Sequence, residues 1–312
     1  MTMMKAGRIH RFGGPEVLVI EDAPRPEPKT GEVLVQLLGT SVNPVDYKTR
    51  EGKFPPIGAD KLPMTLGRDI AGMVVACGPD VGNIAVADSV YGMPQLGHGS
   101  YAEFGILRAV DLATAPATLP LVEAAAVPLA ALTAWQGLFR HAGLAAGQRV
   151  LIHGAAGGVG HFAVQFAKVH GATVFATASA ADLDFVRSLG ADTVIDYKDG
   201  RFEDEAHAID VVLDLIGGST QERSWACLKP GGILVSTVAE PDRGRESAAK
   251  ARPGKRYMTE SSGADLGEIA RLIDAGDVRV YIAKLFDFAD LVAAQTMLQA
   301  GGVRGKIAVK II

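Results

Sequence analysis

The stretch Gln-Arg-Val-Leu-Ile-His-Gly-Ala-Ala-Gly-Gly-Val-Gly at residues 148–160 decides the fold. Its apolar run at 150–152 predicts a strand buried on both faces, and the apolar spacing over 158–168 predicts an amphipathic helix. A glycine-rich turn joins them at a helix start, where backbone N–H groups lack intrahelical partners and a pyrophosphate can approach closely. The turn departs from G-x-G-x-x-G because Ala155 takes the first glycine position. The residues predicted to hold the pyrophosphate are Gly157, Gly158, Val159 and Gly160.

The middle of the chain repeats this strand–helix unit. Further strands are predicted at 172–177, 193–196, 209–215 and 233–237. Strands that alternate with helices are typical of a parallel, doubly wound α/β sheet, the Rossmann arrangement. Dinucleotides lie at the carboxyl ends of such strands. The residues there that we expect to contact the cofactor are Ile216, Gly217 and Thr237.

The end of the second strand distinguishes the two nicotinamide dinucleotides. A carboxylate there, about 20 residues beyond the glycines, binds the ribose 2′-OH of NAD and repels the 2′-phosphate of NADP. The chain has Thr-Ala-Ser at 177–179 and no acid, which favours NADP(H). We expect Ser179 to bind the 2′-phosphate, together with Tyr197 unless that residue is an ordinary surface tyrosine. The nearest carboxylate, Asp182, is explained as the partner of Ser179 in a capping box.

Composition limits the class of protein. A chain of 312 residues is long enough for two domains, and 48% hydrophobic with 21% charged residues is ordinary for a soluble protein. The formal net charge of −4 gives no electrostatic argument for binding nucleic acid or an anionic membrane. Cys77 and Cys227 are too few for a disulfide framework and belong to no metal-type cluster. Without an apolar leader or spanning stretch, we expect a cytoplasmic protein with no nucleic-acid or membrane partner.

The two ends of the chain have a different pattern. Short strands are predicted at 17–20, 32–39, 69–76 and 100–106, with Gly- and Pro-rich turns between them. Such a pattern is typical of a small β-barrel. The tail is predicted to contain helices at 265–275 and 288–300 and a closing strand at 306–312 that rejoins the barrel. We therefore predict one domain from 1–123 with 265–312, and a dinucleotide-binding domain at 124–264.

Several motifs follow one another along the chain. They are Ser41-Val42-Asn43-Pro44-Val45-Asp46, Gly67-Arg68-Asp69-Ile70-Ala71-Gly72, Gly99-Ser100-Tyr101-Ala102-Glu103, residues 127–134, the glycine turn, Leu228-Lys229-Pro230-Gly231-Gly232 and Arg304-Gly305-Lys306. In this order they resemble the medium-chain dehydrogenase/reductase superfamily, and within it the zinc-independent quinone oxidoreductase branch. The stretch 43–67 is similar to its enone and 2-alkenal reductases. The resemblance implies a GroES-like catalytic domain, a Rossmann domain, NADP(H), and a homodimer with 254–259 as a candidate edge.

The resemblance also bears on metal use. The positions that match the catalytic zinc ligands of the alcohol dehydrogenases in this superfamily are Asn43, Arg68 and Leu129. None of these is a normal zinc ligand. Residues 92–101 contain no cysteine, so the structural zinc lobe is missing as well. We therefore expect hydride transfer without a metal to an already activated small molecule: a quinone, or the C=C bond of an α,β-unsaturated carbonyl.

Such an acceptor must be held over the nicotinamide, shielded from water, and stabilised as negative charge develops on its oxygen. Lys48 is the candidate for that last role, with a solvated lysine as the alternative. Asn43 would orient the carboxamide or the acceptor oxygen, unless it only forms the turn before Pro44. By resemblance, Thr133 lies beside the nicotinamide. Arg304 closes over the cofactor from the tail, with a surface charge as the alternative.

Two departures from the family limit the reaction. Phe54 stands where the thioester-reducing enoyl reductases have a catalytic tyrosine, so we expect water to supply the proton. Quinone oxidoreductases often have tyrosines at the positions of Lys48 and Phe54, so the usual quinone pocket is not predicted. His153 and His161 are interpreted as packed or hydrogen-bonded scaffold residues. Three alternatives remain open: a non-catalytic NADPH-binding sensor, an RNA-binding crystallin-like protein, and an alcohol dehydrogenase.

Overall fold

The chain forms two compact units in a computed structural model that describes residues 2–242, 244–245, 250, 252 and 254–312. Unit 1 comprises Met1–Leu129, Ser261–Gly276 and Val280–Ile312, and unit 2 comprises Ala130–Glu260 and Asp277–Arg279. The sequence-based division lies at 123/124 and 264/265, a few residues away from these boundaries. Every helix within the described ranges is too short or too polar to cross a membrane.

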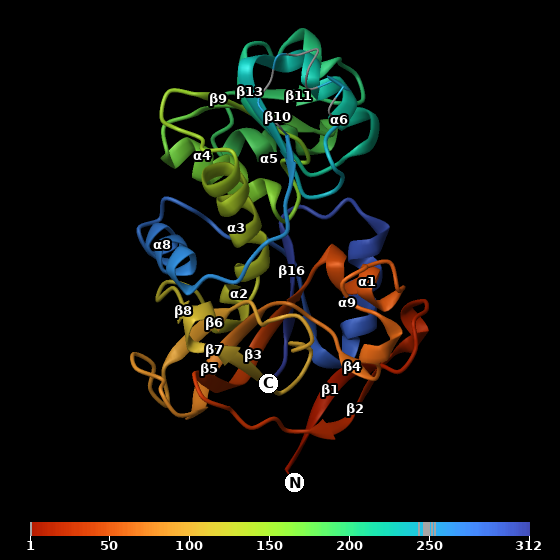
Figure 1. Ribbon diagram of the computed structural model, residues 1–312, viewed down its shortest axis with the longest axis vertical. Helices are drawn as coiled ribbons and strands as arrows, with labels where there is room; N and C mark the ends of the chain where they lie inside the picture. Colours follow the sequence, from red (N-terminus) through yellow and green to blue (C-terminus); the bar gives the residue numbers. More distant parts are fainter. Residues whose placement is uncertain (1, 243, 246–249, 251, 253) are drawn as a thin grey trace. The chain divides into compact units, whose positions relative to one another are not determined.

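Two sheets form the GroES-like barrel of unit 1 (Figure 1). The smaller has the order β2-β1-β4, made of Leu18–Pro24, Met3–Ile9 and Met64–Thr65. The larger has the order β15-β16-β3-β5-β6-β8, made of Ile282–Asp287, Lys306–Lys310, Glu32–Val42, Ile70–Cys77, Ser89–Gly92 and Leu112–Thr114, with β7 (Phe104–Arg108) also paired to β3. The strand predicted at 100–106 thus begins at Phe104, because Ser100 and Tyr101 belong to a preceding turn.

The register of β16 against β3 positions the site. The two strands are antiparallel, with Ile307 opposite Val42 and Ala308 opposite Ser41. One step further along each strand, Lys306 therefore meets Asn43, which begins the next helix. Residues more than 260 positions apart in the sequence become neighbours in this way.

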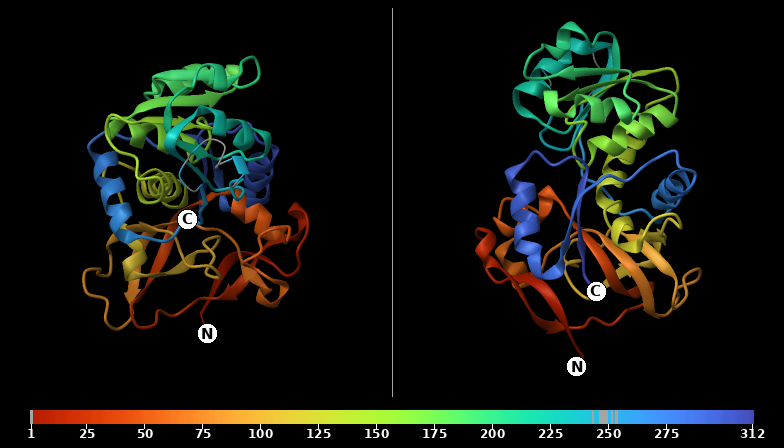
Figure 2. Two further views of the ribbon diagram at one scale, coloured as in Figure 1. Left: turned by 45° about the horizontal axis from the view of Figure 1, so that its top comes forward. Right: turned by 180° about the vertical axis from the view of Figure 1, so that it is seen from behind.

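Four α-helices accompany these sheets: α1 (Pro44–Arg50), α2 (Leu121–Ala124), α8 (Gly263–Asp274) and α9 (Leu291–Ala300). Helix α1 starts directly after β3, with Pro44 in its first turn and the Asp46 carboxylate accepting a hydrogen bond from the Asn43 N–H. Helices α1 and α9 lie side by side in Figure 1 and Figure 2. Arg50 is buried between them and donates to Gln295 at 2.6 Å and to Gln299 at 2.8 Å. This contact fixes α1, which the sequence analysis did not predict.

Unit 2 is a doubly wound Rossmann domain, which confirms the predicted fold class. Its six strands are parallel in the order β11-β10-β9-β12-β13-β14, made of Thr193–Asp196, Thr173–Ala178, Arg149–Ile152, Ile209–Asp214, Leu228–Ser236 and Lys255–Arg256. Its helices are α3 (Pro128–Trp135), which starts at the end of unit 1, α4 (Gly160–Val169), α5 (Leu183–Ser188) and α6 (Gly218–Ser224). Every residue of β12 is buried, as expected for a strand covered on both faces.

Candidate active site

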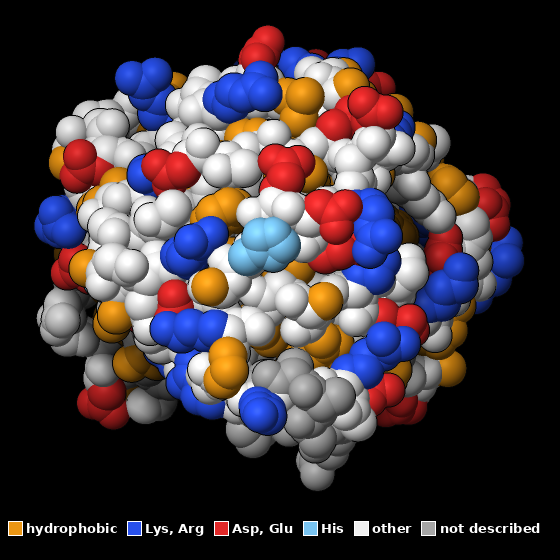
Figure 3. Space-filling view, turned by 90° about the horizontal axis from the view of Figure 1, so that it is seen from above, with side chains coloured by type: hydrophobic (Ala, Val, Ile, Leu, Met, Phe, Trp, Pro, Cys, Tyr) orange, Lys and Arg blue, Asp and Glu red, His pale blue; other side chains and the backbone are white. Residues whose placement is uncertain are grey.

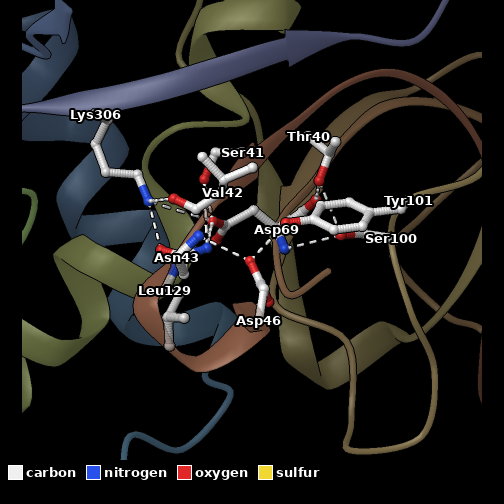
Figure 4. A network of polar contacts seen from close by, with 10 residues as sticks. All are labelled: Thr40, Ser41, Val42, Asn43, Asp46, Asp69, Ser100, Tyr101, Leu129 and Lys306. Carbon is white, nitrogen blue, oxygen red and sulfur yellow. Dashed lines mark hydrogen bonds and ion pairs between the residues drawn. The ribbon is translucent and has the colours of Figure 1, made fainter. Parts of the chain in front are cut away.

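A buried polar network surrounds Asp69 in unit 1 (Figure 4). The Oδ1 atom of Asp69 accepts a hydrogen bond from the Leu129 N–H at 2.7 Å. Its Oδ2 atom accepts one from Asn43 Nδ2 at 2.7 Å and another from the Ser41 hydroxyl. A carboxylate can be buried at low cost only when its oxygens are bonded in this way. The end of β3 and the start of β5 are therefore joined through one acid.

The cation of the network is Lys306, whose side chain is 4% exposed. Its ammonium donates to the Val42 carbonyl at 3.3 Å and to Asn43 Oδ1, and it lies 3.7 Å from Asp69 Oδ2. Burial lowers the pKa of Lys306, while the charges of Asp69 and Asp46 act in the opposite direction. The carboxamide of Asn43 thus bridges a cation and an anion, and these two partners fix which way the amide points.

Asp46 is the second buried acid. Its Oδ2 atom accepts hydrogen bonds from the Tyr101 hydroxyl and from the Asn43 N–H, each at 2.7 Å. Burial nevertheless raises the pKa of Asp46 from 3.8 to about 7, because removal from water disfavours the carboxylate more than these two bonds favour it. Burial also raises the pKa of Tyr101 well above its usual range, and the charge of Asp46 adds to this. Asp46 can therefore change its protonation state near neutral pH, whereas Tyr101 stays protonated.

A small pocket, partly open to solvent, adjoins this network within unit 1. Its apolar lining includes Phe54, Ile57, Met64, Leu66 and Leu96. Asp46, Arg68 and His98 are its charged or titratable lining residues. Burial lowers the pKa of the half-buried Arg68, and the nearby charges of Asp46 and Asp69 oppose that shift. An apolar molecule with one polar group suits such a lining.

The two predicted catalytic residues, Asn43 and Lys48, lie in different surroundings. Asn43 is buried within the network. Lys48 is exposed on α1, is not part of the pocket lining, and makes no side-chain hydrogen bond or ion pair within the described ranges. Arg304 is exposed, two residues before Lys306. The role of Lys48 stays a prediction.

The three positions that match zinc ligands come together around Asp69. Asn43 and Leu129 both donate to its carboxylate, and Arg68 precedes it in the chain. An amide, a guanidinium and an aliphatic side chain are not the donors that zinc prefers. No group of three His, Cys, Asp or Glu side chains that could hold a metal occurs in the part of the chain that the structure describes.

The glycine turn of unit 2 fits a dinucleotide. A Cβ atom on Gly160 would lie 2.2 Å from the Gly154 carbonyl oxygen, so the close packing of the turn under α4 requires glycine there. A Cβ atom on Gly157 would meet only that oxygen, at 3.4 Å, and otherwise lie in open space. Space above a glycine at a helix start is where a pyrophosphate can approach the backbone.

Ser179 and Tyr197 lie at the ends of two neighbouring strands, β10 and β11. The Tyr197 N–H donates to the Ala178 carbonyl at 3.2 Å, and the Tyr197 side chain is 52% exposed. The Ser179 hydroxyl donates to the Asp182 carboxylate at 2.6 Å and makes no cap hydrogen bond to the turn that follows, so the predicted capping box is not formed. Both predicted 2′-phosphate contacts therefore lie at one edge of the sheet.

The remaining predicted cofactor residues surround Asp214 or lie on α3. The Asp214 carboxylate accepts from the N–H groups of Ile216 at 3.0 Å and Gly217 at 2.8 Å, and its carbonyl accepts from the Thr237 N–H at 3.2 Å. One acid thus fixes the ends of β12 and β13. Thr133 lies on α3 with its hydroxyl 2.6 Å from that of Thr259.

The two histidines near the glycine turn are scaffold residues, as interpreted from the sequence. The ring of His153 lies 3.0 Å from the Thr177 hydroxyl and 2.9 Å from the Ser224 hydroxyl, and burial lowers its pKa to about 4. His161 Nδ1 lies 3.1 Å from the Gly157 carbonyl oxygen. His153 therefore stays neutral at physiological pH and ties β9 to β10 and α6.

No role was predicted from the sequence for Asp69, Tyr101 or Lys306. Each of them lies in one of the motifs on which the family resemblance rests, and the network collects a residue from five of these motifs. The polar residues of these separate motifs were thus the sequence feature from which the network could have been predicted. Nothing local to Lys306 distinguishes it from an exposed lysine.

Comparison with known proteins agrees with this architecture. Residues 29–117 match the alcohol dehydrogenase GroES-like domain, and residues 189–309 match the zinc-binding dehydrogenase family. Human NAD(P)H oxidoreductase RTN4IP1, mitochondrial, is 34% identical, covering 100% of this chain and 90% of its own length. The NADPH-dependent alkenal/one oxidoreductase, chloroplastic, of Arabidopsis thaliana is 35% identical, covering 98% of this chain and 79% of its own.

Solved structures extend the comparison. The quinone oxidoreductase from Coxiella burnetii superposes with a TM-score of 0.91 at 35% identity and covers 100% of both chains. The Escherichia coli quinone oxidoreductase complexed with NADPH superposes with a TM-score of 0.88 at 27% identity, covering 98% of this chain and 100% of its own. The chain therefore belongs to the medium-chain dehydrogenase/reductase superfamily, with relatives that are quinone oxidoreductases and alkenal/one reductases.

Proposed function

We propose that the protein is an NADPH-dependent oxidoreductase that transfers a hydride to a quinone or to the C=C bond of an α,β-unsaturated carbonyl, without a metal. The observation that supports this most directly is the set of side chains at the zinc-ligand positions. Asn43, Arg68 and Leu129 lie around Asp69 and offer no zinc ligand set. Carbonyl reduction that relies on a metal as Lewis acid does not suit these residues, whereas an activated acceptor needs no metal.

The cofactor part of the proposal rests on unit 2. Gly157, Gly158, Val159 and Gly160 would hold the pyrophosphate, and the residues at the strand ends would hold the rest of the dinucleotide. The lack of an acid at 177–179 favours NADPH, and an NADPH complex among the similar structures supports that choice. By resemblance, Thr133 and Arg304 complete the contacts.

When bound, NADPH supplies the hydride. The protein has to hold the acceptor, exclude water and stabilise negative charge on the acceptor oxygen. The network around Asp69 holds the backbone at the start of α1 and just before β5, and α1 and residues 64–68 provide part of the pocket lining. Phe54 in that lining has no proton to give, and we propose that water supplies the proton that completes the reduction.

The test is oxidation of NADPH and NADH, followed by the near-ultraviolet absorbance of the reduced nicotinamide, with panels of quinones and enones, with and without a chelator. Turnover that prefers NADPH and ignores the chelator supports the proposal. Loss of turnover with the chelator would favour an alcohol dehydrogenase. NADPH binding without turnover on any acceptor would favour a sensor.

RNA binding is the alternative from another class. Acidic and basic side chains are interspersed on the face drawn in Figure 3. RNA binding through phosphate contacts needs clustered Lys and Arg and weakens steeply with salt. A gel shift at low and moderate salt tests this, and tight, salt-resistant binding would contradict a purely enzymatic role.

We also propose a homodimer through residues 254–259. Strand β14 (Lys255–Arg256) is the last strand of the unit 2 sheet, and both of its residues are exposed. An unpaired strand edge can pair with a second copy. Light scattering after size-exclusion chromatography measures the mass, and a monomer at all concentrations would contradict the dimer.

A further inference from the structure

We propose that Arg68 donates the hydrogen bond that holds the carbonyl oxygen of the acceptor, in the pocket of unit 1, and that this acceptor is electrically neutral. The inference rests on the proposed function and deepens it. It gives to Arg68 the role that the sequence suggested for Lys48, and it narrows the acceptors to neutral enones and quinones.

The guanidinium of Arg68 lies at the wall of the pocket. Arg68 is half-buried and lines the pocket, yet within the described ranges its side chain donates to no protein acceptor. Burying a guanidinium without a hydrogen-bond partner is costly. Lys48, in comparison, is exposed and lies outside the pocket lining. Arg68 is therefore the cation that a ligand in this pocket can reach.

Other donors already hold the carboxylates near Arg68. Asp46 Oδ2 accepts from Asn43 and Tyr101. Asp69 accepts from Leu129, Asn43 and Ser41 and is paired with Lys306. These acids attract Arg68 electrostatically without taking its N–H groups in hydrogen bonds. The donors of Arg68 remain available to a ligand.

The charges around the pocket favour a neutral acceptor. Two cations, Arg68 and Lys306, accompany two buried acids, Asp46 and Asp69. An anionic acceptor would add a negative charge near the Asp69 carboxylate, whereas a neutral carbonyl adds none. The lining by Phe54, Ile57, Met64, Leu66 and Leu96 also favours an apolar, uncharged body.

The chemical role follows from where charge develops. Hydride adds to the β-carbon of the enone, the C=C electrons move toward the carbonyl oxygen, and an enolate and NADP⁺ form. Water then protonates the α-carbon, giving the saturated ketone. A quinone takes up the hydride and a proton to give the hydroquinone. In both cases the oxygen becomes negative, and a preorganised cation with N–H donors in a poorly solvated pocket stabilises it.

The experiment compares Arg68→Met with Arg11→Met in NADPH-dependent reduction of the neutral aryl enone benzylideneacetone. Arg11 is exposed and does not line the pocket, so it controls for loss of a positive charge. We expect Arg68→Met to lower kcat/KM by about 100-fold, the scale of losing one oxyanion donor, and Arg11→Met to leave it unchanged. Equal activity of the two variants would overturn the proposal, as would a comparable loss in Lys48→Ala with none in Arg68→Met.

The variant Arg68→Lys distinguishes loss of the guanidinium donors from a folding defect. It keeps the positive charge beside Asp46 and Asp69, so the pocket stays electrostatically balanced, but it replaces the planar fork of donors with a shorter-reaching ammonium. We expect an intermediate kcat/KM with an unchanged urea midpoint. Activity as low as that of Arg68→Met with a lowered midpoint in both variants would make Arg68 a structural residue and overturn the proposal.

Equilibrium binding separates this proposal from the proposed function. Acetophenone and benzoate share a ring and differ in charge, and neither has a reducible C=C bond. Wild type should bind acetophenone more tightly in calorimetry, and Arg68→Met should weaken it about tenfold while Arg11→Met does not. Tighter binding of benzoate than of acetophenone would overturn the proposal that the acceptor is neutral. Absence of turnover in wild type on every acceptor would refute the reductase, whereas this binding difference would still support the role of Arg68.

Discussion

The ammonium of Lys306 and the carboxylate of Asp69 form a buried ion pair, with Nζ and Oδ2 3.7 Å apart and side chains 4% and 0% exposed. The separation exceeds a direct hydrogen bond, and the Asn43 carboxamide completes the connection between the two charges. Such a pair adds little net stability, but removing one partner leaves a buried charge without compensation.

Lys306→Met should therefore lower the free energy of unfolding by about 3–5 kcal/mol, measured by urea denaturation. The double variant Lys306→Met/Asp69→Asn should recover part of that loss because it also removes the unpaired carboxylate. If the free energy of unfolding of Lys306→Met stayed within about 1 kcal/mol of that of wild type, Asp69 would not be held as a buried anion by Lys306.

Asp46→Asn should change how stability depends on pH. Because the pKa of Asp46 is raised in the folded state, from 3.8 to about 7, its contribution is fully present below pH 3.8 and is lost as pH rises through 7. Between about pH 5 and about pH 8, wild type should lose about 3 kcal/mol relative to the variant, whose amide cannot ionise but can still accept from Tyr101 and Asn43.

Denaturation curves at both pH values measure this difference. Asp60→Asn is the matched control, since that carboxylate is exposed in the same unit, and its profile should parallel wild type. Parallel profiles for wild type and Asp46→Asn would show that Asp46 does not titrate in this range.

The Rossmann part of the fold was predictable because its strands are covered on both faces. Such strands leave continuous apolar runs such as 150–152 and 211–213, and each run is followed by a turn or helix start. Short elements such as α1 and β8 are among those that escaped prediction. Helix α1 has seven residues and β8 has three, which is too few to establish a hydrophobic period.

Individual residues of the site could be predicted from the sequence, but the way they come together could not. Asn43 and Arg68 could be singled out because they stand at zinc-ligand positions of relatives, and the glycine turn has its own pattern. Burial of Lys306 depends on the register of β16 with β3, which joins residues more than 260 positions apart. No local pattern specifies such a pairing, and a lysine is ordinarily expected at the surface.

Gly157→Ala should separate cofactor binding from folding. The added methyl meets only the Gly154 carbonyl, at 3.4 Å, so the midpoint of unfolding without NADPH should stay near that of wild type. The same methyl occupies the space proposed for the pyrophosphate, so Kd for NADPH should rise about tenfold or more, in fluorescence titration of the reduced nicotinamide.

Gly160→Ala is the comparison variant. Its methyl would lie 2.2 Å from the same carbonyl oxygen, so it should destabilise the fold itself by about 1–3 kcal/mol. If Gly157→Ala bound NADPH as tightly as wild type, the pyrophosphate would not lie over this turn.

Tyr197→Phe tests the choice between the two dinucleotides. The exposed phenol stands at the end of β11, beside Ser179 at the end of β10, where the 2′-phosphate of NADPH is proposed to lie. A hydrogen bond to a charged group contributes about 1.5–3 kcal/mol, so its loss should raise Kd for NADPH about 10- to 100-fold. NADH has no 2′-phosphate, so its Kd should not change and serves as the internal control. Equal effects on both cofactors would place Tyr197 near the rest of the dinucleotide, and no effect on either would make it the surface tyrosine of the alternative interpretation.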